Sequence, residues 1–428
     1  MKNVLVFPCG SEVGLEIYKS LNVSTHFTLY GGSSVSDHGQ FVYENYIEGL
    51  PFIDDPQFTD KLNQIIAEYN IDFIFPAHDS AVLKLAQERE LGVLKCEVVT
   101  SSVETCEVSR SKRKTYEVFN NIIPTPHMYE NMQDITDKNF PIFLKPDVGQ
   151  GSKGVYRADT LEDVAFYTNK DPSLLLLEYL PGKEYTIDCF TNKNGELLFS
   201  QGRERSRVSG GISVSSKVVK DERFATLARK INATLKFRGV WFFQVKENTK
   251  GEYVLMEIAP RVAGTMGLAR CRGVNLPLLA LFDSLNFDVS VSENSYDMVI
   301  DRALHNSYKH NLHYEHVYLD FDDLVLLNDK INPLVIAFVY QCINKSIKVH
   351  LITKHKDNIH ETLERYRLTG IFDEVLRIDK TDNKHLYITE KNAIFIDDSF
   401  AERKEVQDQC KIPVFDSHMI ESLTESFK

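Results

Sequence analysis

Residues 142–154 read IFLKPDVGQGSKG, and this stretch is the most informative part of the chain. An apolar, β-rich run ends near Lys145 and opens into a glycine-rich loop. Because glycine lacks a Cβ, such a loop can approach oxyanions closely and point its N–H groups at them, while the lysine adds a positive charge. The spacing is not that of a Walker A motif, and a plain turn is the competing interpretation of the loop taken alone. The stretch predicts a strand followed by a phosphate-binding loop with glycines at Gly149, Gly151 and Gly154.

A second informative stretch is LLLLEYLPGKEYTIDCF, at Leu174–Phe190. It predicts a buried strand, a Pro-Gly turn and a second strand. Glu178 falls at the end of the first strand and Glu184 at the start of the next. The two carboxylates are therefore expected on either side of a short connector.

A carboxylate-bearing hairpin follows at Val240–Gly264, VWFFQVKENTKGEYVLMEIAPRVAG. Its two strands carry Gln244 and Glu257, and Arg261 lies just beyond the second strand. The order of lysine, glycine-rich loop, Glu-containing connector, Gln and Glu-x-x-Pro-Arg strongly resembles the ATP-grasp superfamily, especially its carbamoyl-phosphate-synthase-like branch. The resemblance covers about residues 109–285.

This resemblance implies that ATP is a substrate and that Mg²⁺, which Mn²⁺ can replace, is its cation. Lys112 and Lys145 would grip the ATP phosphates beneath the glycine-rich loop. Gln244 and Glu257 would hold Mg²⁺ against the β- and γ-phosphates, because oxygen ligands suit this hard cation. Ala259 stands where the family usually has a metal-binding Asn, so the second metal position lacks that ligand. The connector Glu178, Tyr179 and Leu180 would receive adenine through its backbone, and Glu184 would bind the ribose hydroxyls.

Three arginines occupy alternate positions in GRERSRVSGGISVSSK, residues 202–217. In a strand, Arg203, Arg205 and Arg207 would face one side together, and three like charges there need an anion. By the resemblance, Arg203, Arg205 and Arg261 would bind the substrate carboxylate and the transferred phosphate, which suits the planar guanidinium group. The competing interpretation is a solvated charged strand.

The last third of the chain carries a second set of acidic residues. HVYLDFDDLVL, at His316–Leu326, is an apolar strand that ends in Asp320 and Asp322, and these carboxylates repel unless a metal or a proton separates them. Two later strands, in KVHLITK and AIFIDDS, also end in polar residues. The set resembles the haloacid dehalogenase (HAD) superfamily over about residues 315–428. Its remaining members are Thr353, Lys384, Asp397 and Asp398.

The HAD resemblance implies that Asp320 attacks phosphorus to form an aspartyl-phosphate, while Asp322 protonates the leaving oxygen and later activates water. Leu324 stands where the family commonly has Thr, and the gaps between motifs are too short for a large cap domain. The ligand is then expected to be bulky or covered by the neighbouring domain. A surface acidic turn is the competing interpretation of DFDD alone. Phosphoryl oxygens would be bound by Thr353 and Lys384, and Mg²⁺ by Asp397 or Asp398 with Asp320 and the main chain of Asp322.

Composition restricts the class of protein. A chain of 428 residues forms about two to four domains with cores of their own. The net charge of −12 argues against nucleic-acid binding, and no apolar segment is long enough for a membrane helix. Seven scattered cysteines without metal spacing are typical of a reduced, cytoplasmic protein. Cys9 is expected to be a small buried apolar residue rather than a nucleophile.

Periodicity predicts an α/β multidomain chain. Strand–helix units at the N-terminus and in DFIFPAHDSAVLKLAQE (Asp72–Glu88) indicate a small parallel sheet, the pre-ATP-grasp domain of the resemblance. At its strand end, His78 and Asp79 are interpreted as helix-capping residues rather than ligands, with Asp79 and Ser80 as the natural caps. The predicted divisions are residues 1–108 for this domain, 109–290 for α+β ATP-grasp domains, 291–314 for a linker and 315–428 for a Rossmann-like HAD domain without a large cap.

These features predict a bifunctional enzyme. ATP would phosphorylate a small-molecule carboxylate, an amine would attack the acyl phosphate to form an amide, and the fused phosphatase would act on a phosphorylated metabolite. Two alternatives stay open, namely a kinase or carboxyphosphate-type activator without an amine acceptor, and a HAD-like half that only docks. The sequence does not decide the oligomeric state, and a homodimer stays open.

Overall fold

The computed structural model describes residues 1–149, 151, 153–304 and 306–425. The chain forms two compact units, Met1–Leu304 and His305–Lys428. Among the described residues, no helix is long and apolar enough to cross a membrane.

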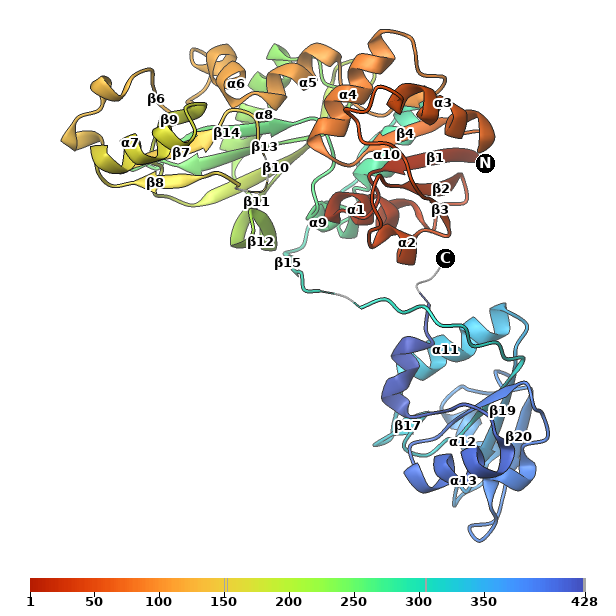
Figure 1. The fold of residues 1–428 in the computed structure, drawn as a ribbon. Helices are drawn as coiled ribbons and strands as arrows, with labels where there is room; N and C mark the ends of the chain where they lie inside the picture. The colour runs from red at the N-terminus through yellow and green to blue at the C-terminus, as the bar shows by residue number, and fades with distance from the viewer. Residues whose placement is uncertain (150, 152, 305, 426–428) are drawn as a thin grey trace. The chain divides into compact units, whose positions relative to one another are not determined.

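The first unit begins with a parallel five-stranded sheet of order β3-β2-β1-β4-β5 (Figure 1). Apolar side chains cover both faces of β1, as is usual for a central parallel strand. Cys9, just beyond β1, is buried as expected, and burial raises the pKa of its thiol to about 12. The strands are β1 (Lys2–Phe7), β2 (Phe27–Gly32), β3 (Asn45–Ile47), β4 (Phe73–Pro76) and β5 (Glu97–Val98), with helices α1 (Glu12–Leu21), α2 (Gly39–Val42), α3 (Phe58–Glu68) and α4 (Asp79–Glu90).

The order of this sheet reverses at β1, which lies between β2 and β4. In open parallel sheets, ligands bind beyond the carboxyl ends of the strands at such a reversal point. The chain leaves β1 into α1 and β4 into α4, so the first residues of both helices lie at this edge. The predicted parallel sheet within residues 1–108 is confirmed.

A four-stranded antiparallel sheet of order β6-β9-β7-β8 carries the lysine and the glycine-rich loop. Helices α5 (Val103–Arg110) and α6 (Lys112–Phe119) precede it, and α7 (Leu161–Lys170) lies against it (Figure 1). Its strands are β6 (Met128–Tyr129), β7 (Ile142–Pro146), β8 (Tyr156–Ala158) and β9 (Leu174–Glu178).

A six-stranded antiparallel sheet of order β14-β13-β10-β11-β12-β15 forms the centre of the first unit. Its apolar side chains pack on α8 (Glu222–Thr234), where Phe224, Trp241 and Phe243 are buried together. Another core joins it to the N-terminal sheet, because Val4, Phe242 and Leu281 belong to one buried cluster. The strands are β10 (Glu184–Thr191), β11 (Leu197–Ser209), β12 (Ile212–Val219), β13 (Gly239–Glu247), β14 (Tyr253–Ala259) and β15 (Val299–Asp301). Helices α9 (Gly267–Cys271) and α10 (Leu276–Ser284) lie between β14 and β15 in the chain.

One predicted boundary is wrong. The segment 291–314 is predicted to be a linker, but β15 lies within it and pairs antiparallel with β12. The sheet therefore extends to residue 301, and the division between the two compact units falls at Leu304. The short run of Val299, Ile300 and Asp301 gives little periodicity, so its pairing depends on the exposed edge of β12.

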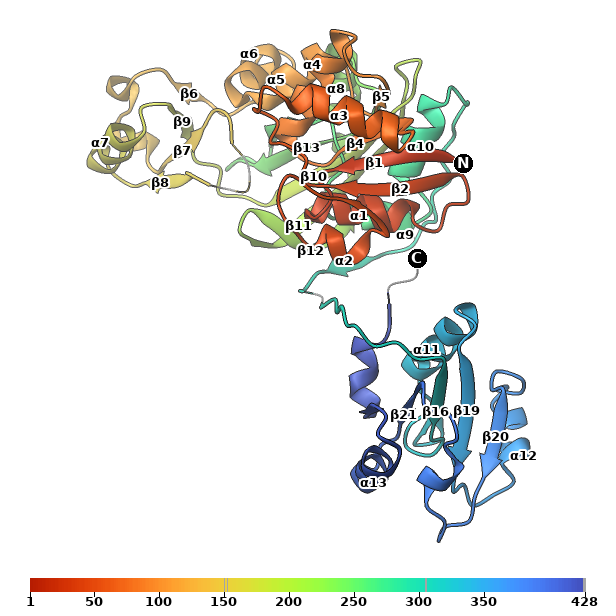
Figure 2. The ribbon, with the colours of Figure 1, turned by 45° about the vertical axis from the view of Figure 1, so that its right-hand side comes forward.

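The second unit is built on a parallel five-stranded sheet of order β20-β19-β16-β21-β22 (Figure 2). Its order also reverses at a central strand, β16, whose neighbours are β19 and β21. The strands are β16 (His316–Leu319), β19 (Lys348–Thr353), β20 (Glu374–Arg377), β21 (Ala393–Ile396) and β22 (Val414–Phe415), with a small hairpin of β17 (Leu326–Leu327) and β18 (Lys330–Ile331) and helices α11 (Pro333–Asn344), α12 (Ile359–Arg365) and α13 (Phe400–Cys410).

Candidate active site in the first unit and carboxylate cluster in the second

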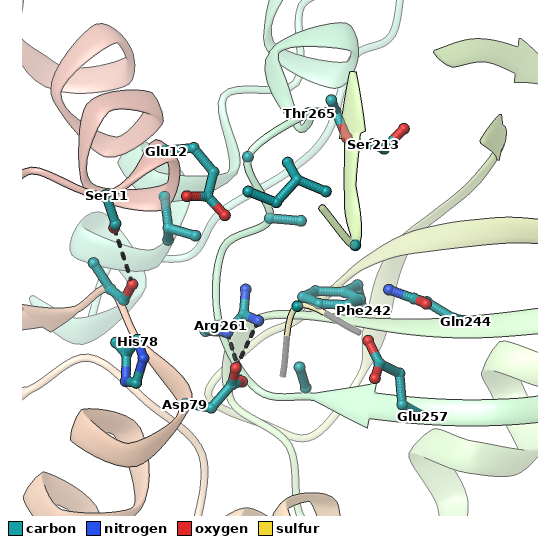
Figure 3. A pocket seen from close by; sticks show the side chains of 18 of the residues that line it. Ser11, Glu12, His78, Asp79, Ser213, Phe242, Gln244, Glu257, Arg261 and Thr265 are labelled. Carbon is teal, nitrogen blue, oxygen red and sulfur yellow. Dashed lines mark hydrogen bonds and ion pairs between the residues drawn. The ribbon is translucent and has the colours of Figure 1, made fainter. Parts of the chain in front are cut away.

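A cavity of about 340 Å³ in the first unit lies at the carboxyl edge of the N-terminal sheet. One side is formed by the starts of α1 and α4, and the other by β11 to β14 (Figure 3). A smaller adjoining cavity of about 160 Å³ reaches Lys145 and Glu184. Both cavities are lined by Lys112, Gly149, Gly151, Arg205, Gln244 and Glu257, so the structure brings most of the predicted ATP-grasp residues together.

Gln244 and Glu257 face each other across the hairpin of β13 and β14, where they form a directly opposed pair. Their side chains project into the cavity (Figure 3). A carboxylate and an amide oxygen at this spacing fit a hard divalent cation. Ala259, two residues beyond Glu257, offers no side-chain oxygen, which agrees with the departure seen in the sequence.

Lys145, the last residue but one of β7, is a buried lysine with 5% exposure. Its Nζ donates a hydrogen bond of 2.7 Å to the hydroxyl of Tyr116, and it forms no ion pair with the described residues. Burial, together with the charge of Lys112, lowers the pKa of Lys145 to about 7 despite the opposing charge of Glu257. Burial also lowers the pKa of Lys112, whose Nζ donates to the carbonyl of Asp147 at 3.1 Å. Because burial disfavours the charged forms of both lysines, an anion bound beside them would stabilise those forms.

The three arginines of β11 already have carboxylate partners within the chain. Ion pairs join Arg203 to Asp188 at 2.8 Å, Arg205 to Glu184 at 2.8 Å and Arg207 to Asp301 at 3.0 Å. The inference that three like charges need an external anion is therefore wrong. A register shift between Arg205 and Arg207 also interrupts the alternation, and Arg207 does not line the cavity.

Arg203 nevertheless keeps one free donor at the cavity. Its Nε and Nη2 bind Asp188, while Nη1 is buried without a hydrogen-bond partner among the described residues. A buried guanidinium nitrogen left unpaired is costly, and a phosphate or carboxylate oxygen would satisfy it. Of the three arginines, Arg203 thus fits an anionic ligand best.

Arg261 and Asp79 form a two-pronged ion pair at 2.7 and 2.9 Å. Burial opposes ionisation of Asp79, but the charge and hydrogen bonds of Arg261 outweigh it, so the pKa of Asp79 lies below its ordinary value. The capping interpretation of His78 and Asp79 holds for His78 but not for Asp79. His78 caps α4, because its Nδ1 accepts from the N–H of Ser80 at 3.3 Å, whereas Asp79 turns to Arg261. The partner lies 182 residues away, which no local pattern reveals.

The predicted adenine connector lies between β9 and β10. Glu178 accepts a hydrogen bond from the N–H of His127 at 3.1 Å, and Leu180 is buried. The ring of Tyr179 lies against the guanidinium of Arg157 and the amine of Lys246. A small cavity of about 20 Å³ is lined here by Pro126, Phe143, Leu177, Glu178, Tyr179, Leu180, Lys246 and Met256.

The glycine-rich loop touches a second glycine turn, formed by Gly210 and Gly211. A Cβ on Gly211, in the turn between β11 and β12, would lie only 2.3 Å from the carbonyl carbon of Gly151. Gly151 and Gly154 adopt positive φ angles of 62° and 70°, which favour glycine. Gln150 and Ser152 lie outside the described residues.

In the second unit, three carboxylates gather at the carboxyl ends of β16 and β21. Asp320, Asp397 and Asp398 each offer an oxygen, and these atoms all lie within 4.8 Å of one another. Lys384 Nζ lies 2.9 Å from Asp320 and 2.6 Å from Asp397. Burial raises the pKa of Asp320 to about 7 although Lys384 opposes this shift. Asp320 and Asp397 are buried and Asp398 is exposed, and a set of this kind at the reversal point of a parallel sheet fits a divalent cation.

The other predicted residues of the second unit do not belong to this group of three carboxylates. Thr353 ends β19, and its hydroxyl accepts from the N–H of His355 at 3.1 Å. Asp322 Oδ1 lies 2.8 Å from His355 Nδ1, and its side chain is not in the carboxylate cluster. His355 was not identified from the sequence, although it follows Thr353 by two residues. Lys384 lies in a short 3-10 helix rather than at a strand end, and Leu324 is buried in the core.

Comparison with known proteins agrees with the first unit's architecture. Residues 170–302 match the family model described as ATP-grasp in the biosynthetic pathway with Ter operon. A carbamoyl-phosphate synthase from Methanobrevibacter smithii is 28% identical over 152 residues, which are 33% of this chain and 41% of that protein. A D-alanine–D-alanine ligase from Petrotoga mobilis is 29% identical over 154 residues, 35% of this chain and 49% of that protein.

The chain thus spans less than half the length of these curated relatives. Among solved structures, carboxyaminoimidazole ribonucleotide synthase from Aspergillus clavatus, complexed with ATP, matches with a TM-score of 0.57 at 16% identity. The match covers 70% of this chain and 81% of that one. The chain therefore contains the ATP-grasp fold.

Proposed function

We propose that the first unit is an ATP- and Mg²⁺-dependent ligase that joins a carboxylate to an amine through an acyl phosphate. The observation that carries this proposal is one connected site that Gln244 and Glu257 share with the half-buried Lys112 and the buried Lys145. The lysines lack carboxylate ion-pair partners among the described residues, and the triphosphate of ATP supplies the missing negative charge.

In the proposed reaction, an oxygen of the substrate carboxylate attacks the γ-phosphorus, and the bond to the β–γ bridging oxygen breaks to release ADP. The amine nitrogen then attacks the acyl carbon, phosphate leaves, and the nitrogen loses a proton. Such phosphoryl transfer depends mainly on positioning and charge stabilisation. Lys112, Lys145 and Arg203 Nη1 supply positive charge, and Gln244 with Glu257 would hold Mg²⁺, which neutralises the phosphate oxygens when bound.

The test is an ADP-release screen over pairs of carboxylates and amines, with mass detection of the product. An amide that appears only when both substrates are present supports the ligase. ADP release with carboxylate alone, and no amide with any amine, would instead favour the kinase or activator alternative. Failure of the protein to bind ATP with Mg²⁺ would contradict both.

We propose further that the second unit is a Mg²⁺-dependent phosphatase of the HAD type. The arrangement of Asp320, Asp397, Asp398 and Lys384 supports this function. Asp320 would attack phosphorus and release the alcohol, and water would then hydrolyse the aspartyl-phosphate. His355 is placed to hold Asp322 for proton transfer. A bound Mg²⁺ would offset the charge of the carboxylates and of the phosphate.

This second activity is tested with a broad panel of phosphometabolites. Turnover that requires Mg²⁺ and Asp320 supports the phosphatase. An absence of turnover over the whole panel, with no metal bound at the carboxylate cluster, would favour a docking role.

The free cysteines of the described chain suit the reduced cytoplasmic location that we propose.

A further inference from the structure

A buried hydroxyl in the central sheet of the first unit has no hydrogen-bond partner. Thr186 lies in β10, and 0% of its surface is exposed. Among the described residues, no group donates to its Oγ1 or accepts from it. A hydroxyl that is removed from water without a partner costs free energy of folding. In the free protein this group therefore lowers stability rather than adding to it.

Thr186 stands beside Gln244 in this sheet. The antiparallel register places Thr186 directly opposite Gln244 on one side and directly opposite Arg203 on the other. Gln244 is in turn opposite Glu257. Directly opposed residues of an antiparallel pair project from the same face, with Cβ atoms about 4.5–5.5 Å apart. The four side chains thus form one row across the face that carries the proposed Mg²⁺ ligands.

The amide of Gln244 is not held by any of the residues that the structure describes. It forms no hydrogen bond with them, although its side chain projects into the cavity (Figure 3). An amide can present either its oxygen or its NH₂ group to a ligand, and only the oxygen binds a cation. A neighbour that accepts a hydrogen bond from Nε2 would turn Oε1 towards the cation.

The position of Thr186 favours this role over a contact with the ligand itself. Thr186 lines neither of the two adjoining cavities, whereas Gln244 lines both. The guanidinium of Arg203 is already fixed, because its Nε and Nη2 donate to Asp188 at 2.8 and 3.0 Å. Gln244 is therefore the neighbour whose orientation a hydroxyl at Thr186 can still determine.

We propose that Thr186 is a positioning residue for the cation site. In the complex with Mg²⁺ and ATP, its Oγ1 accepts a hydrogen bond from Gln244 Nε2, and this contact directs Gln244 Oε1 to the cation. The inference rests on the proposed ligase function, and it adds to that function a residue that touches neither the metal nor the nucleotide. The hydroxyl is then unpaired only in the free protein.

Thr186→Val, which removes the hydroxyl and keeps the shape of the side chain, tests this role in the full chain. Binding of Mg²⁺ in the presence of a non-hydrolysable ATP analogue, measured by calorimetry, should weaken at least about fivefold. The free variant should unfold at an equal or higher urea concentration, because a buried and unpaired hydroxyl has been removed. Thr186→Ser keeps the hydroxyl and should bind Mg²⁺ as the wild-type protein does.

Thr191→Val is the matched control on the same strand. Thr191 is also fully buried, but its hydroxyl donates to Asn232 Oδ1 at 2.6 Å and accepts from Trp241 Nε1 at 2.8 Å. Loss of this paired hydroxyl should lower the stability of the free protein and leave Mg²⁺ binding unchanged. The two valine variants are thus expected to show opposite patterns.

A double variant identifies the partner of the hydroxyl. In the background of Gln244→Met, which removes the amide, Thr186→Val should no longer change Mg²⁺ binding. An effect that persists there would overturn the assignment, as would unchanged Mg²⁺ binding or a lower stability of the free protein in Thr186→Val alone. A wild-type protein that binds no nucleotide with Mg²⁺ would instead contradict the proposed function itself.

Discussion

Arg261 and Asp79, which lie 182 residues apart, form a two-pronged ion pair that ties the end of β14 to the start of α4. The pair connects the hairpin of β13 and β14 to the N-terminal part of the first unit. It also accounts for the position of Arg261, because its guanidinium is held at the cavity by the carboxylate of Asp79, the first residue of α4.

This pair should contribute to the stability of the first unit. Asp79→Asn leaves Arg261 without its partner in a largely buried site, and we expect a loss of about 1–3 kcal/mol. Urea unfolding measures this loss of stability, and hydrogen exchange of β1 and β4 in the native protein locates it. The control is Glu130→Gln, which removes an exposed pair with Arg113 and should cost less than about 1 kcal/mol. Equal losses in the two variants would contradict the role of the pair.

ATP binding should take up protons near pH 8. In the free protein Lys145 has a pKa lowered to about 7, so it is mostly neutral at that pH. Phosphate oxygens favour the ammonium form, so binding raises this pKa and the protein gains up to about one proton. Calorimetry in buffers of different ionisation enthalpy measures the uptake.

Lys145→Met should abolish that uptake, and Lys170→Met, at the end of α7, serves as its comparison. The same shift affects stability with a defined sign. The unfolded lysine binds a proton up to about pH 10.5 and the folded one only up to about 7, so this group makes the protein more stable as pH rises between these values. Nucleotide binding without proton uptake at pH 8 would contradict the placement of Lys145 at the phosphates.

Glu257→Gln should lower ADP formation by at least about two orders of magnitude, because it removes one stabiliser of the transition-state charge. The apparent affinity for Mg²⁺ in the presence of ATP should fall with it. Glu252→Gln, in the turn of the same hairpin, is the matched control and should keep the rate. Undiminished ADP formation in Glu257→Gln would show that the hairpin does not hold the cation.

Asp320→Asn should abolish phosphatase turnover while ADP formation in the ligase assay continues. The nucleophile is lost, but the residues of the first unit are unchanged. Phosphoester hydrolysis and ADP formation are measured on the same preparation, with Asp329→Asn as the comparison variant. Equal loss of both activities would mean that the two reactions share one composite site.

The local pattern of the chain determined much of the secondary structure. The apolar runs before Gln244 and Glu257 predict the hairpin of β13 and β14, which the structure confirms. The strand–helix units at both ends of the chain likewise form parallel sheets. Such information is local, because the spacing of apolar side chains reports only which face of one element is buried. Residues at the ends of strands could therefore be selected as candidates before their neighbours were known.

The tertiary structure alone decided which charges remain available to a ligand. The alternate spacing of Arg203 and Arg205 could not reveal that Asp188 and Glu184 pair with them. The same holds for Arg261 and Asp79, which lie 182 positions apart in the sequence and form an ion pair. Ion pairing depends on distances between side chains of different elements, and periodicity within one element contains no such distances. The sequence by itself determined the elements and the candidate residues, while the packing of the sheets decided which of those residues are free to bind.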